Sequence, residues 1–135
     1  MAAFHASAKS LLAGATTTAR LRALRDTRPG FERSTWRALA DAGWFAMLSP
    51  EGQGGLGLDL PHAAAIAEEI GRVLLPEPFV AAGVQAIATL CALPAGDLRD
   101  QLIARATAGE WVLGSAAGAR GRARCARTRH HIDPR

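Results

Sequence analysis

The sequence predicts an all-α fold: a helical up-and-down domain followed by a disordered Arg-rich tail. Apolar residues recur at helical spacing through most of residues 1–115, and Pro and Gly interrupt these stretches at short intervals. The last twenty of the 135 residues differ, because thirteen of them are Ala, Gly or Arg. We therefore divide the chain into a helical domain, 1–115, and a basic low-complexity tail, 116–135.

The first part of the chain predicts three helices. Apolar residues at helical spacing from Phe4 to Ala15 indicate one helix, which the threonines at 16–18 weaken, and a second helical piece continues to about Arg25. The motif Arg-Pro-Gly at 28–30 stops the second helix, since Pro and Gly both break helices. The third helix carries Trp36 and leads to Trp44. We interpret both tryptophans as core residues, because amphipathic aromatic side chains at helical spacing are usually buried.

A glycine-rich turn lies near the centre of the chain, at residues 43–59. Four glycines fall within residues 52–57, which permits positive φ angles and close approach of other segments. These glycines match the literal dinucleotide-binding pattern G-x-G-x-x-G. That site requires a strand leading in and a helix starting inside the motif, whereas here Pro50 precedes the glycines and the next helix begins only near Asp59. We interpret the motif as a packed turn between helices.

The next predicted helix begins at Asp59 as N-cap and ends at Leu75, because Pro76-Glu77-Pro78 cannot continue it. Its apolar stripe runs to Leu74. Glu68 and Glu69 diverge by about 100° on a helix, so they do not form a facing acid–base pair.

Residues 78–90 predict a further helix that is apolar on nearly all sides and is therefore expected to be central and buried. Its small residues leave room that a neighbouring helix or a long apolar ligand would fill. A last helix is expected from an N-cap at Asp97 to about Ala108. Residues 111–113, Trp-Val-Leu, have strand character.

The charge of the chain is concentrated in the tail. The net charge is +4, yet residues 116–135 alone hold six arginines and one acid, while the remainder has ten bases and eleven acids. Cys125, His130 and His131 lack the second ligand pair of a metal site, and His5 and His62 stand alone. The residues therefore predict no catalytic, cofactor-binding or metal-binding set. No apolar run is long enough to span a membrane, and a cytoplasmic location is expected.

Several short motifs follow one another in a consistent order: Trp36-x-x-Leu-Ala, Gly43-Trp44, Leu48-x-Pro-Glu, Gly54-Gly-Leu-Gly57, Ala67-Glu-Glu-Ile-Gly-Arg72 and Pro76-x-Pro-Phe79. In this order they resemble the N-terminal helical domain of acyl-CoA dehydrogenases. The stretch LIARATAGE at 102–110 is similar to the closing helix of that domain. The resemblance covers about residues 31–115.

The resemblance implies an FAD enzyme built from a helical N-terminal domain, a β middle domain and a helical C-terminal domain. In such enzymes a carboxylate removes the α-proton of an acyl-CoA thioester while a hydride leaves the β-carbon for flavin N5. The N-terminal domain shapes the acyl-chain end of the pocket, and the candidate wall residues here are Phe79, Gly83 and Ala86. The flavin contacts and the base belong to the other domains, so this chain alone is expected to bind no FAD and to be inactive. The intact parent is expected to be a homo-oligomer.

After Glu110 the sequence departs from the family and becomes Arg-rich. Arginine outnumbers lysine fifteen to one, which suggests a GC-rich gene, and we hypothesise that the reading frame slips near residues 115–118 to leave a truncated fragment. The alternative is a stand-alone helical interaction module whose tail binds nucleic acid or an acidic partner. Salt-dependent DNA binding lost on deletion of 116–135 would favour that alternative.

Overall fold

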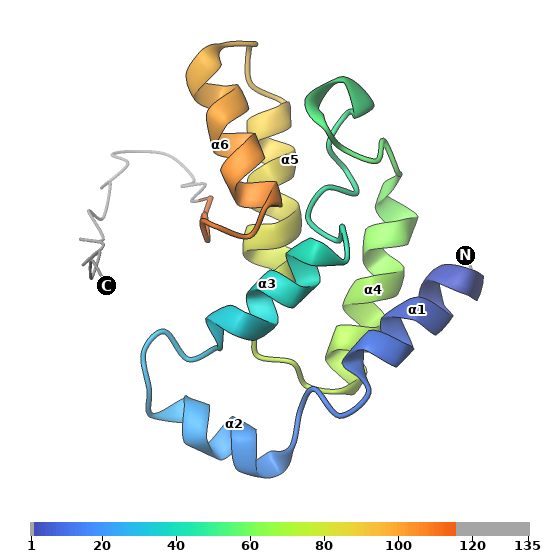
Figure 1. The fold of residues 1–135 in the computed structure, drawn as a ribbon, viewed down its shortest axis with the longest axis vertical. Coiled ribbons are helices and arrows are strands. Elements are labelled where there is room, and N and C mark those ends of the chain that lie inside the picture. Colours follow the sequence, from blue (N-terminus) through green and yellow to red (C-terminus); the bar gives the residue numbers. More distant parts are fainter. Residues whose placement is uncertain (1, 116–135) are drawn as a thin grey trace, which may run out of the picture.

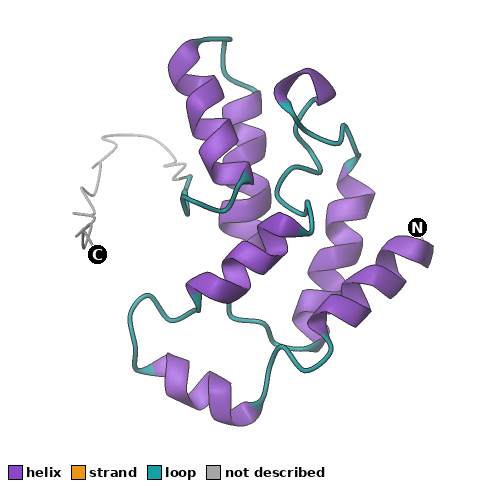
Figure 2. Ribbon diagram, viewed as in Figure 1, coloured by secondary structure: helices purple, strands orange, loops and turns teal. Residues whose placement is uncertain are grey.

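This computed structural model describes residues 2–115, with side chains described from residue 6. The regular secondary structure of this part of the chain is helical (Figure 2). The elements in chain order are α1 (Ala2–Leu12), α2 (Thr18–Arg25), α3 (Arg33–Asp41), the short 3₁₀ helix η1 (Glu51–Gln53), α4 (Leu60–Arg72), the π-helix η2 (Phe79–Gln85), α5 (Ala86–Cys91) and α6 (Asp97–Thr107). The prediction of an all-α fold is confirmed. The predicted tail, with Cys125, His130 and His131, lies outside the described residues. None of the described helices is long and apolar enough to cross a membrane.

Two helix pairs frame the fold. α1 packs on α4, and α5 packs on α6, which runs back beside it after a short turn (Figure 1). Between the two pairs, α3 contributes Trp36 and Leu39 to the interior. In Figure 1, α2 stands apart from the other helices.

Aromatic rings form the centre of the core, and both predicted core tryptophans are buried. The ring centroids of Trp36 and Phe45 lie 4.2 Å apart, and Trp44 meets Phe79 edge-on at 6.1 Å. Offset and edge-to-face arrangements of this kind suit the charge distribution of aromatic rings. The core therefore joins α3 and the turn that follows it to the start of η2.

The glycine-rich turn is closed by its own backbone hydrogen bonds. Within it, N–H groups of residues 54–58 donate to nearby carbonyls, including Leu56 to Ala46 at 2.9 Å and Gly57 to Ser49 at 2.9 Å. Gly55 lies so close to the buried Ser49 that an added Cβ would be 2.0 Å from the Ser49 carbonyl oxygen. The prediction of a packed turn in which glycine permits close approach is confirmed.

The predicted end of α4 is wrong. The helix stops at Arg72 rather than Leu75, because Leu74 has φ of +54° and cannot continue a right-handed helix. Leu74 does not belong to the buried stripe, since it is 67% exposed. At the other end, Asp59 is the N-cap residue but makes no side-chain capping bond; its carboxylate is paired with the ring of His62, for which the sequence pattern predicts no partner.

The helix after Pro78 also differs from the prediction. Its first seven residues are π-helical, and only one face of the helix is buried, since Val80 is 56% exposed. The apolar composition predicts burial all round, but the described residues cover a single face. Residues 111–113 form no strand; Val112 and Leu113 pack on the core instead. Asp97 is the first residue of α6 rather than its N-cap.

We expect Gly55→Ala to lower the free energy of unfolding by at least roughly 1–3 kcal/mol, because the new methyl group meets backbone atoms that are held by the turn. Gly52→Ala in the same turn is the control, since an added Cβ there meets nothing within 4 Å. Denaturant titration of both variants tests this difference. Equal stability of the two would contradict the close approach described here.

Candidate functional site

The three candidate wall residues lie on one helix and face the core. Phe79 and Gly83 belong to η2 and Ala86 begins α5; all three are buried. An added Cβ at Gly83 would lie 2.6 Å from Cδ1 of Phe45. Phe79 therefore packs in the core cluster, and the backbone at Gly83 lies against the ring of Phe45.

The opposite face of the same helix is directed outward. Val80 is 56% exposed, and Ala81 and Ala88 are also exposed. Other large apolar side chains are exposed as well, including Leu93 and Leu98 around the turn between α5 and α6. The outer face of this helix thus exposes the apolar residues Val80, Ala81 and Ala88 together with the polar residues Gln85 and Thr89.

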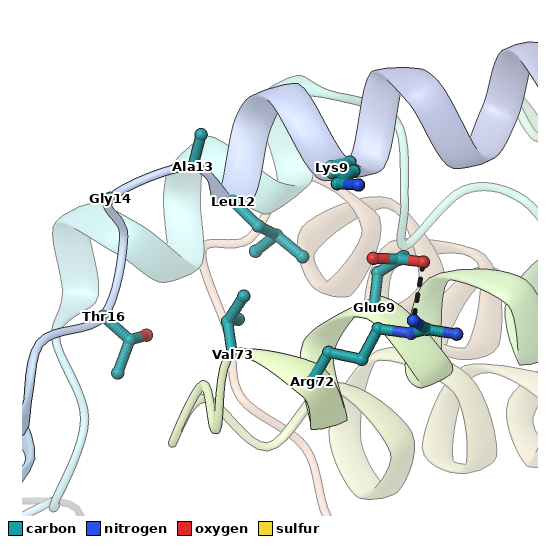
Figure 3. A pocket seen from close by; sticks show the side chains of 8 residues that line it. All are labelled: Lys9, Leu12, Ala13, Gly14, Thr16, Glu69, Arg72 and Val73. Atoms are coloured by element: carbon teal, nitrogen blue, oxygen red, sulfur yellow. Dashed lines mark ion pairs between the residues drawn. The ribbon is translucent and has the colours of Figure 1, made fainter.

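A pocket of about 290 Å³ lies elsewhere, between the end of α1 and the end of α4. Figure 3 shows its lining side chains, among which Leu12 and Val73 approach each other from the two helices. The guanidinium of Arg72 pairs with the carboxylate of Glu69 at 3.5 Å and more closely, at 2.5 Å, with Glu68, which does not line the pocket. The candidate wall residues do not line it.

Among the residues with described side chains, the most deeply buried charged group is the carboxylate of Glu77, which lies between the two prolines that separate α4 from η2. Its side chain is 0% exposed, and its Oε1 accepts a hydrogen bond of 2.5 Å from Nη2 of Arg20 on α2. The backbone N–H of Glu32 donates to the same oxygen at 3.3 Å. Arg20 also donates through Nε to Oε2 of Glu32 at 3.0 Å and through Nη2 to Oγ1 of Thr35 at 3.2 Å.

The pKa of Arg20 reflects two opposing effects. Burial disfavours the charged guanidinium, but hydrogen bonds to Glu77 and then to Glu32, together with their negative charges, hold its pKa above the ordinary value. The guanidinium is therefore a permanent cation. Arg20 and Glu77 thus form an ion pair whose carboxylate is fully buried.

Sequence reasoning missed this pair. The available signal was an acidic residue in a Pro-Glu-Pro segment flanked by the apolar residues Leu75 and Phe79, both of which are buried. No local pattern pointed to Arg20, which lies 57 positions away. Pairing over such a distance depends on how the helices pack.

The glycine-rich turn does not fit a flavin or dinucleotide pyrophosphate. Such a site presents free backbone N–H groups at a helix N-terminus. Here the N–H groups of residues 54–58 already donate to carbonyls of the turn itself. Among the side chains that the structure describes, no group of three His, Cys, Asp or Glu residues could hold a metal ion.

The described residues thus form an all-α domain with an aromatic core. The profile of the acyl-CoA dehydrogenase N-terminal domain matches residues 3–110. The chain therefore belongs to the acyl-CoA dehydrogenase family, and its described part is the N-terminal domain.

Relatives in two organisms support this assignment. The chain is 36% identical over 84 residues to the acyl-CoA dehydrogenase IpdE2 of Mycobacterium tuberculosis, which covers 62% of this chain and 26% of that protein. It is 35% identical over 71 residues to IpdE2 of Mycolicibacterium smegmatis, covering 52% and 23% of the two chains. The chain thus matches about a quarter of the length of these relatives.

Solved structures share the fold. A variant of the Tcur3481-Tcur3483 steroid ACAD superposes with a TM-score of 0.72 at 27% identity, over 84% of this chain and 31% of that one. The ChsE4-ChsE5 complex from Mycobacterium tuberculosis also gives a TM-score of 0.72, at 24% identity and over 82% and 30% of the two chains.

We expect Gly83→Ala to destabilise the domain by about 1–3 kcal/mol, because the ring of Phe45 that the methyl group meets is itself held against Trp36. Gly71→Ala on α4 is the matched control: an added Cβ there meets nothing within 4 Å, and Ala is the better helix former by about 0.5–1 kcal/mol. Thermal unfolding of both variants measures the difference. A Gly83→Ala variant as stable as Gly71→Ala would show that Phe45 does not restrict this position.

Proposed function

We propose that this chain is the N-terminal part of an FAD-dependent enzyme that removes hydrogen from the α and β carbons of an acyl-CoA thioester. The observation that carries the proposal is the family match over residues 3–110. The described residues do not fit the flavin, because the glycine-rich turn has used its N–H groups internally. In this proposal, the flavin and the catalytic base are held by the middle and C-terminal domains of the parent enzyme.

The role proposed for this domain is to form the acyl-chain side of the substrate pocket. The helix of η2 and α5 supports this role, because the apolar residues Val80, Ala81 and Ala88 are exposed on its outer face, where an acyl chain or another domain can cover them. Phe79, Gly83 and Ala86 are proposed as wall residues. Since all three residues are buried inside the domain, we infer that they act by setting the position and curvature of the helix.

The substrate class is proposed from one solved relative. That relative is a steroid ACAD, and it shares 27% identity with this chain. We therefore extend the proposal to bulky polycyclic acyl groups as well as linear fatty acyl chains. Both solved relatives are named as pairs, Tcur3481-Tcur3483 and ChsE4-ChsE5, which supports an oligomeric parent enzyme.

We expect the 135-residue chain alone to be colourless and not to reduce an artificial electron acceptor with any acyl-CoA. A carboxylate without a positioned hydride acceptor loses the proximity on which such catalysis depends. Absorbance near the flavin bands and an acceptor assay measure both properties. The control is the longest reading frame of the same gene that encodes the following domains, which should be yellow and active with linear or steroid-type acyl-CoA.

Stoichiometric flavin on the 135-residue chain would contradict the assignment of the cofactor to the other domains. A longer protein that binds flavin but dehydrogenates no acyl-CoA would contradict the proposed reaction. The coding DNA downstream of Ser115 supplies a separate check, because the truncation hypothesis requires an alternative frame that encodes a β-rich continuation.

In the intact parent enzyme, Gly83→Leu should shorten the longest acyl chain that is accepted, because the larger side chain displaces the helix from Phe45 toward the pocket. The ratio of kcat/KM for short and long acyl-CoA thioesters measures this effect. Gly71→Leu, in open space on α4, is the control. If the ratio is unchanged in Gly83→Leu while stability falls, Gly83 serves packing alone.

A further inference from the structure

Residues 16–30, which carry α2, are poorly anchored by apolar contacts. No side chain in this segment is buried. Ala15 and Phe31, which border it, both pack against the core, whereas Leu21 and Leu24 of α2 are half-buried and do not pack against the core cluster. Figure 1 shows α2 set apart from the rest of the helices. Hydrophobic burial therefore contributes little to holding this segment in place.

Arg20 supplies the side-chain hydrogen bonds that join the segment to the rest of the described structure. It reaches Glu77 at 2.5 Å, Glu32 at 3.0 Å and Thr35 at 3.2 Å. The other side-chain hydrogen bonds described for residues 16–30 stay within the segment; for example, Arg25 bonds to Asp26. The attachment of α2 thus depends on a single guanidinium group.

The partner of the Arg20 guanidinium, Glu77, lies in the linker directly before η2. Glu77 belongs to the Pro76–Pro78 linker, and its carbonyl oxygen accepts a 2.7 Å hydrogen bond from the N–H of Phe79, the first residue of η2. Its carboxylate is fully buried under Arg20. Removing one member of a buried ion pair leaves the other charge buried and uncompensated. A state in which Glu77 stays buried without Arg20 is therefore strongly disfavoured.

We propose that residues 16–30 are a hinged arm, held closed over the Pro76–Pro78 linker by the Arg20–Glu77 ion pair. Ala15 and Phe31 are the fixed points of the hinge, and loss of the ion pair opens the arm while the helical core stays folded. Opening uncovers Glu77 and the linker that leads into η2. Once undocked, α2 melts, because helices shorter than about 12–15 residues are marginal in water.

The competing explanation is that the Arg20–Glu77 ion pair stabilises the whole domain. The two explanations differ in which backbone amides lose protection from hydrogen exchange when the ion pair is removed. Local opening exposes one contiguous segment, whereas weakening of the whole fold raises exchange in all helices together.

Hydrogen exchange of the 135-residue chain, measured by mass spectrometry, separates the two. For Arg20→Met we expect exchange in residues 18–25 to rise by at least about tenfold, while residues 60–72 and 97–107 keep their wild-type rates. Arg22→Met is the matched control: Arg22 lies on the same helix, is exposed, and has no described side-chain hydrogen bond. It should leave exchange in both regions unchanged.

A second variant keeps the test decisive if Arg20→Met weakens the whole chain. Arg20→Met with Glu77→Met replaces both charges by apolar groups, which removes the unpaired buried carboxylate. We expect the core helices to regain wild-type protection in this double variant while residues 18–25 still exchange rapidly. The proposal of a hinged arm would be overturned if residues 18–25 kept wild-type protection in either variant. It would also be overturned if all helices of the double variant lost protection in parallel.

Discussion

The contact between Phe45 and Gly83 is the constraint on which the rest of the domain depends. Phe45 follows α3 and Gly83 lies in η2, so their contact joins the two halves of the chain, and there is no space for even a methyl group between them. Trp36 lies on the same ring of Phe45 at 4.2 Å. Fully burying an aromatic ring of this size contributes roughly 1.5–3 kcal/mol. The glycine and the aromatic ring thus determine how closely η2 approaches the core.

The contact with Phe45 lies within the π-helical element η2. Seven residues adopt this π-helical geometry, and they include the glycine that accepts Phe45. π-Helical turns are rare and frequently occur at functional sites. In this chain the π-helix has a buried face that contacts Phe45 and an outer face with Val80 exposed. A helix that packs on the core with one side and exposes Val80 on the other is consistent with the pocket role proposed for this domain.

Two kinds of interaction hold different parts of the domain. Apolar packing joins α1 to α4 and α5 to α6, and it is spread over many side chains. α2 is joined instead by the directional bonds of Arg20. Distributed packing tolerates the weakening of one contact, whereas a single ion pair does not, and this contrast is the physical basis for treating α2 as a separate unit. Its counterpart Glu77 lies next to η2, so the two kinds of interaction meet at the Pro76–Pro78 linker.

The sequence by itself determined the helical class, the approximate helix positions, the burial of Trp36 and Trp44, and the family, because these depend on local spacing and on the order of short motifs. Only the tertiary structure decided how much of residues 79–91 is exposed. Gln85 and Thr89 mark part of the outer face in the sequence, but the apolar residues Val80, Ala81 and Ala88 are exposed beside them. The tertiary structure also decided the end of α4, where Leu74 takes a left-handed conformation, and the pairing of Glu77 with Arg20. These features depend on which segments meet in space, and residues 57 positions apart carry no local signal of their contact.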